Sequence, residues 1–110
     1  MEIIARIEKI GSMSQRQYTD SRTNEQKVFK SIGVTLRAGK DVIYAEAVQE
    51  QADALEMDVT VNKTVRVWCS YFVRLMFNKR EYTDQQGVTH YQTEVNLVSW
   101  EPLYIPVREH

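Results

Sequence analysis

The sequence predicts an all-β fold, a five-stranded antiparallel barrel with one short helix between the third and fourth strands. Apolar and polar residues alternate in most segments, as they do in half-buried strands. One short segment alone changes to helical spacing, and polar turns separate the predicted strands. We expect a single domain over residues 1–110, with a short irregular C-terminal tail from about residue 101.

The first strand is predicted in residues 2–10, where the alternation is loose but continuous. Ile3, Ala5 and Ile7 share one face of this segment. Residues 11–26 are rich in Ser, Gln, Thr and Asn and show no period. This stretch is therefore expected to be a long loop or a frayed extension of a strand.

The second strand is predicted in residues 27–37, where the alternation is clearest. One face of this segment carries Ile32, Val34 and Leu36. The next four residues, 38–41, form a short connection that contains Gly39. Such a connection favours a hairpin, so a third strand is expected in residues 41–47.

The helix is predicted just after the third strand, because Val48, Ala52 and Leu55 are spaced at i, i+4 and i+7 with polar residues between them. A long fourth strand is expected over residues 64–76. Both of its faces carry apolar residues, which suggests that the outer face meets another surface.

The fifth strand is predicted in residues 91–100, after a polar turn at residues 84–87 whose Gly can adopt a positive φ. Its inner face is expected to carry Val95 and Leu97. Pro102 and Pro106 should then end regular structure. Three strands, one helix and two strands, in that order, are the elements of the OB-fold.

The composition and the motif content limit the classes of function that we expect for this protein. Charged residues make up 26% of the chain and the net charge is −1, so any basic surface must be local. No long apolar run predicts a membrane span, and one cysteine, Cys69, fits a reducing cytoplasm. With only two histidines, no metal-ligand spacing and no nucleotide-binding glycine motif, we expect no enzyme activity and no cofactor.

A five-residue pattern occurs twice, as RQYTD at residues 16–20 and REYTD at residues 80–84. Tyr and Thr favour extended backbone, whereas Asp favours a turn, so each copy is expected where a strand enters a loop. In an OB-fold these positions fall in the loops between strands 1–2 and 4–5, which flank the usual ligand-binding face. The alternative explanation is that two strand-to-turn junctions converged on similar local sequences without a shared binding role.

The segment KREYTDQQGVTHYQTEVNL, residues 79–97, resembles the hairpin between strands 4 and 5 of bacterial single-stranded DNA-binding proteins. The rest of the chain matches that family in layout only, as a compact variant similar to primosomal protein B. Val42 and Val48 stand where the family places stacking aromatics, and the chain ends without an acidic tip. The resemblance implies an OB-fold that binds single-stranded DNA and assembles into a homodimer or a higher oligomer.

The candidate binding residues are aromatic side chains for base stacking and basic side chains for phosphates. They lie in the two RxYTD segments and on the predicted second and third strands. They are Arg16, Tyr18, Phe29, Lys30, Arg37, Tyr44, Lys79, Arg80 and Tyr82. Trp68 and Phe72 lie four residues apart on one face of the fourth predicted strand, and they are expected at an oligomer interface or in the core.

These observations predict a non-catalytic, cytoplasmic protein that binds single-stranded DNA, or RNA, largely without sequence preference. The alternative is an OB-fold module that binds proteins of a replication or DNA-transfer complex. Salt distinguishes the two, because phosphate binding weakens steeply with salt through counterion release.

Overall fold

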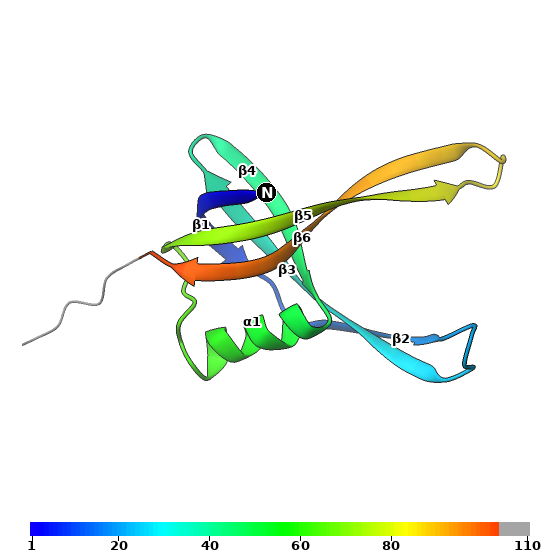
Figure 1. The fold of residues 1–110 in the computed structure, drawn as a ribbon, viewed down its shortest axis with the longest axis horizontal. Helices are drawn as coiled ribbons and strands as arrows, with labels where there is room; N and C mark the ends of the chain where they lie inside the picture. Colours follow the sequence, from blue (N-terminus) through cyan, green and yellow to red (C-terminus); the bar gives the residue numbers. More distant parts are fainter. Residues whose placement is uncertain (104–110) are drawn as a thin grey trace, which may run out of the picture.

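The computed structural model describes residues 1–103, except for the side chain of Arg80. The predicted tail beyond residue 103, Pro106 included, lies outside the described residues. Six strands and one helix follow one another along the chain (Figure 1). In order they are β1 (Glu2–Ile10), β2 (Ser14–Thr19), β3 (Gln26–Ala38), β4 (Asp41–Val48), α1 (Glu50–Thr60), β5 (Ser70–Thr83) and β6 (Thr89–Pro102).

Five of the strands close into a barrel. Hydrogen-bonded neighbours run β1, β5, β6, β4 and β3, and an additional pairing of β1 with β3 completes the circuit. All pairings are antiparallel except β4 with β6, which run parallel at Glu46 and Asn96. The predicted all-β, OB-fold-like barrel with one short helix is confirmed.

Strand β1 reaches two neighbours because it bends. Its first half pairs with β5, and its second half pairs with β3 after a register shift between Ile7 and Lys9. A bulge of this kind bends a strand and increases its twist, which lets one strand turn the corner of a barrel. Arg6 lies at the crossing point, opposite Arg37 on β3 and Ser70 on β5.

The core fills the barrel, and the helix closes one end. The predicted inner face of β3 is confirmed, since Ile32, Val34 and Leu36 are all buried. On α1, Ala52 and Leu55 are fully buried against the strands. The remaining core residues come from the other strands and the loop before β5. They are Ala5, Ile7, Ala45, Ala47, Val65, Tyr71, Val73, Leu75 and Leu97.

The segment before β5 differs from the prediction. Residues 64–69 do not form a strand, and β5 begins only at Ser70. The buried Tyr71 explains this, because its hydroxyl accepts a hydrogen bond from Arg66 N (2.6 Å) and donates one to Arg66 O (3.1 Å). These bonds hold residues 64–69 as a loop, in which Trp68 adopts a positive φ of 70°. Cys69, expected inside a strand, is half-buried beside the core.

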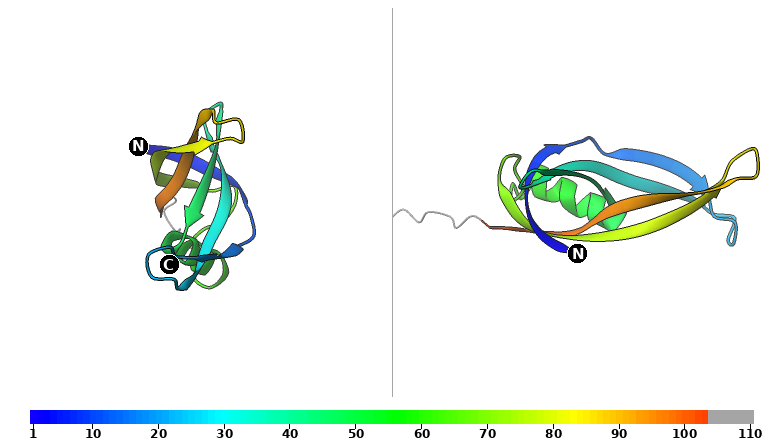
Figure 2. Two further views of the ribbon diagram at one scale, coloured as in Figure 1. Left: turned by 90° about the vertical axis from the view of Figure 1, so that its right-hand side faces the viewer. Right: turned by 90° about the horizontal axis from the view of Figure 1, so that it is seen from above.

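Two hairpins extend beyond the barrel. Part of the predicted polar loop forms β2, which pairs with residues 26–31 of β3 over six residues. The outer parts of β5 and β6 pair as far as Thr83 and Thr89. We call these the β2–β3 arm and the β5–β6 arm. Figures 1 and 2 show both arms leaving the same end of the barrel, opposite the C-terminal end of β6.

Within the described part of the chain, no helix has the length and apolar character needed to cross a membrane.

Candidate nucleic-acid interface

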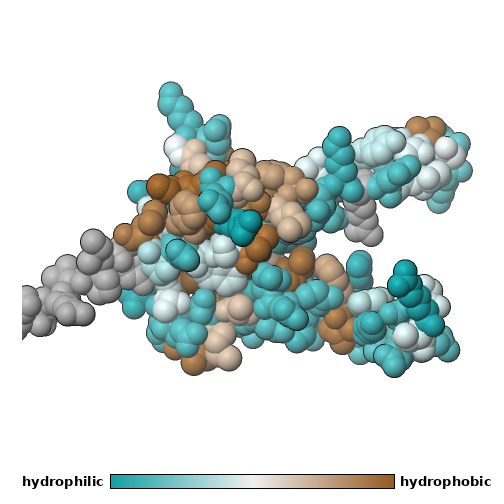
Figure 3. All heavy atoms as spheres, viewed as in Figure 1, coloured by the Kyte–Doolittle hydropathy of each residue, from teal (hydrophilic) through white to brown (hydrophobic). Residues whose placement is uncertain are grey.

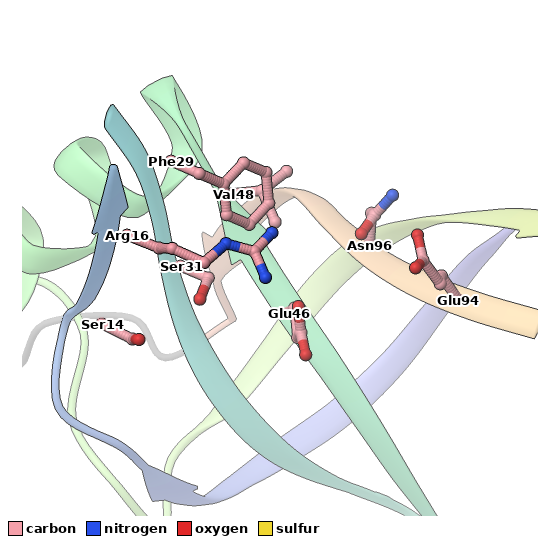
Figure 4. A pocket seen from close by; sticks show the side chains of 8 residues that line it. All are labelled: Ser14, Arg16, Phe29, Ser31, Glu46, Val48, Glu94 and Asn96. Carbon is pink, nitrogen blue, oxygen red and sulfur yellow. The ribbon is translucent and has the colours of Figure 1, made fainter. Parts of the chain in front are cut away.

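A groove of about 530 Å³ opens on the outer face of the sheet, where the two arms leave the barrel (Figure 4). Four strands contribute two side chains each. They are Ser14 and Arg16 from β2, Phe29 and Ser31 from β3, Glu46 and Val48 from β4, and Glu94 and Asn96 from β6. We call this hollow the arm groove.

Strand alternation places these side chains together. On β3, Phe29 and Ser31 alternate with the inward Ile32, so they point away from the core. Direct cross-strand partners of these two residues are Arg16 on β2 and Val48 on β4. One continuous outer row therefore crosses three strands, and the parallel pairing of β4 with β6 adds the fourth.

One side of the arm groove carries a cation–aromatic pair (Figure 4). The Arg16 guanidinium carbon lies 5.6 Å from the centre of the Phe29 ring, within the range of a cation–π interaction. Figure 4 shows the two side chains beside each other at one side of the hollow. A planar cation on an aromatic ring offers a stacking surface and a positive charge at one place.

Tyr44 extends this surface along β4. It is two residues from Glu46, points to the same side and has 76% of its surface exposed. It also lines two smaller hollows that adjoin Glu46. Tyr18 lies two residues beyond Arg16 on β2, on the same face of the arm, and is exposed as well. Phe29 and Tyr44, which the sequence predicted to point outward, therefore do so, and β2 brings Tyr18 to the same side.

Tyr82 stacks on its own hairpin. Its ring lies 5.2 Å from the ring of His90, its cross-strand partner, with an angle of 23° between the planes. His90 Nε2 is 2.7 Å from Asp84 Oδ2. One ring face of Tyr82 is thus used within the arm, while 48% of the side chain remains exposed. The sequence alone left stacking on the hairpin and stacking on a ligand as alternatives.

The aspartate of each RxYTD repeat organises a turn. Asp84 Oδ1 accepts hydrogen bonds from the backbone N–H groups of Gln86 and Val88, both at 2.9 Å. The bond with His90, followed by these amides, lowers the pKa of Asp84 below its usual value. In the other arm, the ion pair with Lys27 (2.9 Å) and a backbone amide likewise lower the pKa of Asp20. The aspartate of each repeat is therefore structural.

The basic candidates do not all reach the arm groove. Arg37 forms an ion pair with Glu8, which raises the pKa of the guanidinium. Lys30 points to the helix side of β3, where its Nζ lies 3.1 Å from Asp53. Lys79 is paired with Thr93 of β6, the neighbour of the groove-lining Glu94, so it points to the opposite face of the β5–β6 arm. Of the predicted basic residues, Arg16 lines the groove; the Arg80 side chain lies outside the described atoms.

Trp68 and Phe72 lie away from the arm groove. Trp68 is exposed in the loop before β5, and Phe72 is half-buried on the outer face of β5, opposite Ile4 of β1. Their assignment to an oligomer interface stays a prediction.

Sequence reasoning missed the two carboxylates of the groove and the role of His90. Glu46 lies between the buried Ala45 and Ala47, so the alternation of β4 was sufficient to place it outward. Glu94 belongs to the hairpin motif but was not assigned to the site. The stacking of His90 on Tyr82 requires the register of the β5–β6 arm, which residue types alone do not fix.

Among residues 1–103, no group of three or more His, Cys, Asp or Glu side chains is placed to hold a metal ion. No protein-family model matches the sequence, and a search of curated proteins finds no significant match.

Proposed function

We propose that this protein binds single-stranded DNA in the arm groove, largely without sequence preference and without catalysis. The observation that carries the proposal is the Arg16–Phe29 pair in a groove between two projecting arms. The resemblance of residues 79–97 to the hairpin of bacterial single-stranded DNA-binding proteins supports the same function. Those proteins use aromatic plates for bases and a basic groove for the backbone.

In this mechanism the strand lies across the outer face of β3 and β4, between the arms. One base stacks on the Arg16–Phe29 pair and another on Tyr44, while the exposed side of Tyr82 offers a third plate. Each stacked base contributes roughly 1–3 kcal/mol, so two or three plates give useful affinity. Duplex DNA has its bases already stacked and paired, and it gains none of these contacts.

The carboxylates of the groove determine where the phosphates run. Glu46 and Glu94 repel a phosphate placed directly above them. The backbone therefore follows the rim formed by the β2–β3 arm, where Arg16 is exposed, and the bases turn inward. Carboxylates can accept hydrogen bonds from the amino or ring N–H groups of bases, so they fit a base more readily than a phosphate.

Fluorescence anisotropy with a labelled oligo-dT of about 35 nucleotides tests the proposal, since OB-folds cover up to roughly 16 nucleotides each. The titration is repeated from low to physiological salt, with duplex DNA and oligo-U as competitors. Tyr44→Ala should weaken binding, because it removes an exposed ring from the outer face of β4 beside Glu46.

Tyr91→Ala is the matched control. Tyr91 is 70% exposed and lies on the β5–β6 arm, opposite Glu81, on the other face of the hairpin from Tyr82. We expect it to bind like the parent protein. Equal losses in Tyr44→Ala and Tyr91→Ala, or no binding at low salt, would contradict the proposed groove.

A second candidate function is a protein-interaction module of a replication or DNA-transfer complex. Two observations favour it, namely the Glu46 and Glu94 carboxylates in the groove and the net charge of −1. A basic peptide segment could occupy such a groove. In that case oligo-dT binding would be absent at every salt concentration, and a Lys/Arg-rich peptide would bind with a dependence on Glu46.

A further inference from the structure

A second hollow, of about 330 Å³, adjoins the arm groove on the outer face of the barrel, and Glu46 lines both. Its volume lies within the range of small-ligand pockets. The end of β1 and the middle of β3 and β4 contribute to its lining. The side chains and backbone that matter here are Lys9, Gly33, Thr35, Tyr44 and Glu46. We call this surface the Gly33 hollow.

The strand register arranges these residues in two rows across the sheet. Lys9 on β1 lies opposite Thr35 on β3, which lies opposite Tyr44 on β4. The next row on the same face has Gly33 opposite Glu46. Two strand spacings, about 10 Å, separate Lys9 from Tyr44. A cation therefore stands on the β1 side of the hollow, and an aromatic ring and a carboxylate stand on the β4 side.

The space beside the carboxylate is open. Apart from the chain neighbours of Gly33, no heavy atom lies within 4 Å of the place where a Cβ at this position would stand. Glu46 is exposed, and within residues 1–103 no hydrogen bond or ion pair engages its carboxylate. Both of its oxygens are thus available to accept hydrogen bonds from a ligand.

A carboxylate on this face favours one base over the others. Proteins read single-stranded bases by hydrogen bonds to their Watson–Crick edges. The edge of guanine carries two adjacent donors, N1–H and the N2 amino group, which match the two oxygens of a carboxylate. Cytosine, adenine and thymine each offer one donor group there, beside at least one acceptor that a carboxylate repels. Guanine is therefore the base that Glu46 fits best.

We propose that the Gly33 hollow binds a guanine base of the bound strand and that Glu46 determines this preference. The base stacks on Tyr44, and its N1–H and N2 amino groups donate to the two Glu46 oxygens. The phosphate of the same nucleotide lies near Lys9. This inference rests on the proposed function, and it adds one base-selective position to a surface that otherwise accepts any base.

The position of Lys9 agrees with the backbone path along the arm groove. Lys9 on β1 and Arg16 on β2 both lie along the edge of β3 that faces away from β4. The backbone can pass both cations while the bases turn towards β4. In Figure 3 the visible face of both arms is mostly hydrophilic, so hydrogen bonds and charge, rather than a broad apolar patch, contact a strand between them.

Fluorescence anisotropy with an oligo-dT of about 10 nucleotides, within the length that one OB-fold covers, tests the preference. One central dT is replaced by dG or by dA, and a single dG cannot form a guanine quadruplex within the strand. The dA oligonucleotide stacks as a purine but lacks the two adjacent donors. The dG oligonucleotide should bind about five- to tenfold more tightly, the lower part of the range for a bidentate contact, because the hollow is open to water.

Two modified bases test which atoms are read. Deoxyinosine lacks the N2 amino group and should lose most of the gain over dA. The base 7-deaza-dG keeps both donors and changes only the opposite edge, so it should retain the gain. Equal affinities of the dG and dA oligonucleotides, or a full preference for deoxyinosine, would overturn the proposal.

Substitutions assign the preference to its residue. Glu46→Gln should remove it, because an amide presents one acceptor and one donor, while oligo-dT should bind this variant somewhat more tightly since a repulsive charge is lost. Glu56→Gln is the matched control, because it makes the same change on the exposed side of α1, outside both hollows. Lys9→Gln should weaken binding of all the oligonucleotides by a similar factor. An equal dG preference in Glu46→Gln and Glu56→Gln would refute the role of Glu46.

Amide chemical shifts with dGMP and dAMP distinguish a failure of this inference from a failure of the proposed function. At millimolar concentrations dGMP should shift the Gly33 and Glu46 amides more than dAMP does. Gly33→Val fills the hollow with a residue that suits a strand, and it should abolish this difference. Oligo-dT binding with no dG preference and no dGMP-specific shift would overturn this inference alone. A dGMP-specific shift without oligo-dT binding would contradict the proposed function and retain the guanine site.

Discussion

Two single substitutions, each removing one positive charge from a different face of the β2–β3 arm, distinguish binding in the arm groove from general electrostatic attraction. Arg16→Gln removes the cation above Phe29 in the arm groove. Lys30→Gln removes a cation from the neighbouring strand, but on the helix side, where Lys30 pairs with Asp53. Both substitutions change the net charge equally, but they alter opposite faces of the sheet.

The magnitude follows from counterion release. Each phosphate contact to a single strand contributes about 0.7 to the slope of log K against log salt. Raising the salt from 50 to 200 mM weakens binding by some factor, and this factor should be about 2.6 times smaller in a variant that has lost one contact. Arg16→Gln should show this smaller slope together with weaker binding at low salt. Lys30→Gln should keep the parental slope.

The assay is oligo-dT anisotropy at four or more salt concentrations, with circular dichroism to verify folding. Lys30→Gln breaks only an exposed ion pair, so its stability should change by less than about 1 kcal/mol. An equal decrease of slope in both variants would refute the assignment of the groove face. An unchanged slope in Arg16→Gln would show that its guanidinium does not contact a phosphate.

Three further predictions concern stability. Tyr71→Phe should lower the free energy of unfolding by about 1–3 kcal/mol in urea denaturation, because the N–H of Arg66 loses its acceptor; an unchanged midpoint would contradict this. The depressed pKa of Asp84 stabilises the arm turn above about pH 4, and this contribution is lost as the pH falls through the lowered folded value. The protection of the turn amides against hydrogen exchange, relative to their intrinsic rates at each pH, should therefore fall in acid, and Asp84→Asn should abolish that pH dependence. Gly39→Ala should destabilise the protein by about 1–2 kcal/mol, because Gly39 has φ 63°, whereas Gly33→Ala in open space should not; equal effects would refute the argument from φ.

Local patterns were sufficient for much of the fold. The alternation of β3 placed Ile32, Val34 and Leu36 in the core, and Gly39 marked the turn into β4. Both properties depend on near neighbours in the chain, which is why the sequence reports them. The strand expected from residue 64 was wrong up to Ser70, because the bonds from buried Tyr71 to Arg66 outweigh the local preference for extended backbone.

The candidate site was harder to predict from the sequence than the fold. The sequence assigned outward aromatic residues correctly to β3 and β4, since alternation determines which face a side chain takes. Alternation was likewise sufficient to place Lys30 on the face of β3 opposite Phe29, where it pairs with Asp53. The position of Arg16 above Phe29 depends on the register of β2 against β3, and register depends on contacts between distant segments.

The sequence by itself therefore determined the order of the five barrel strands and the helix, the core face of β3 and the turns at Gly39 and Gly87, all of which follow from near neighbours along the chain. The tertiary structure decided that β2 joins β3 as an arm and that β4 and β6 close the barrel in parallel. It also brought Glu46 and Glu94 into one groove with Arg16. These features depend on contacts between residues that are distant in sequence, and the closure of the barrel determines which of these residues come into contact.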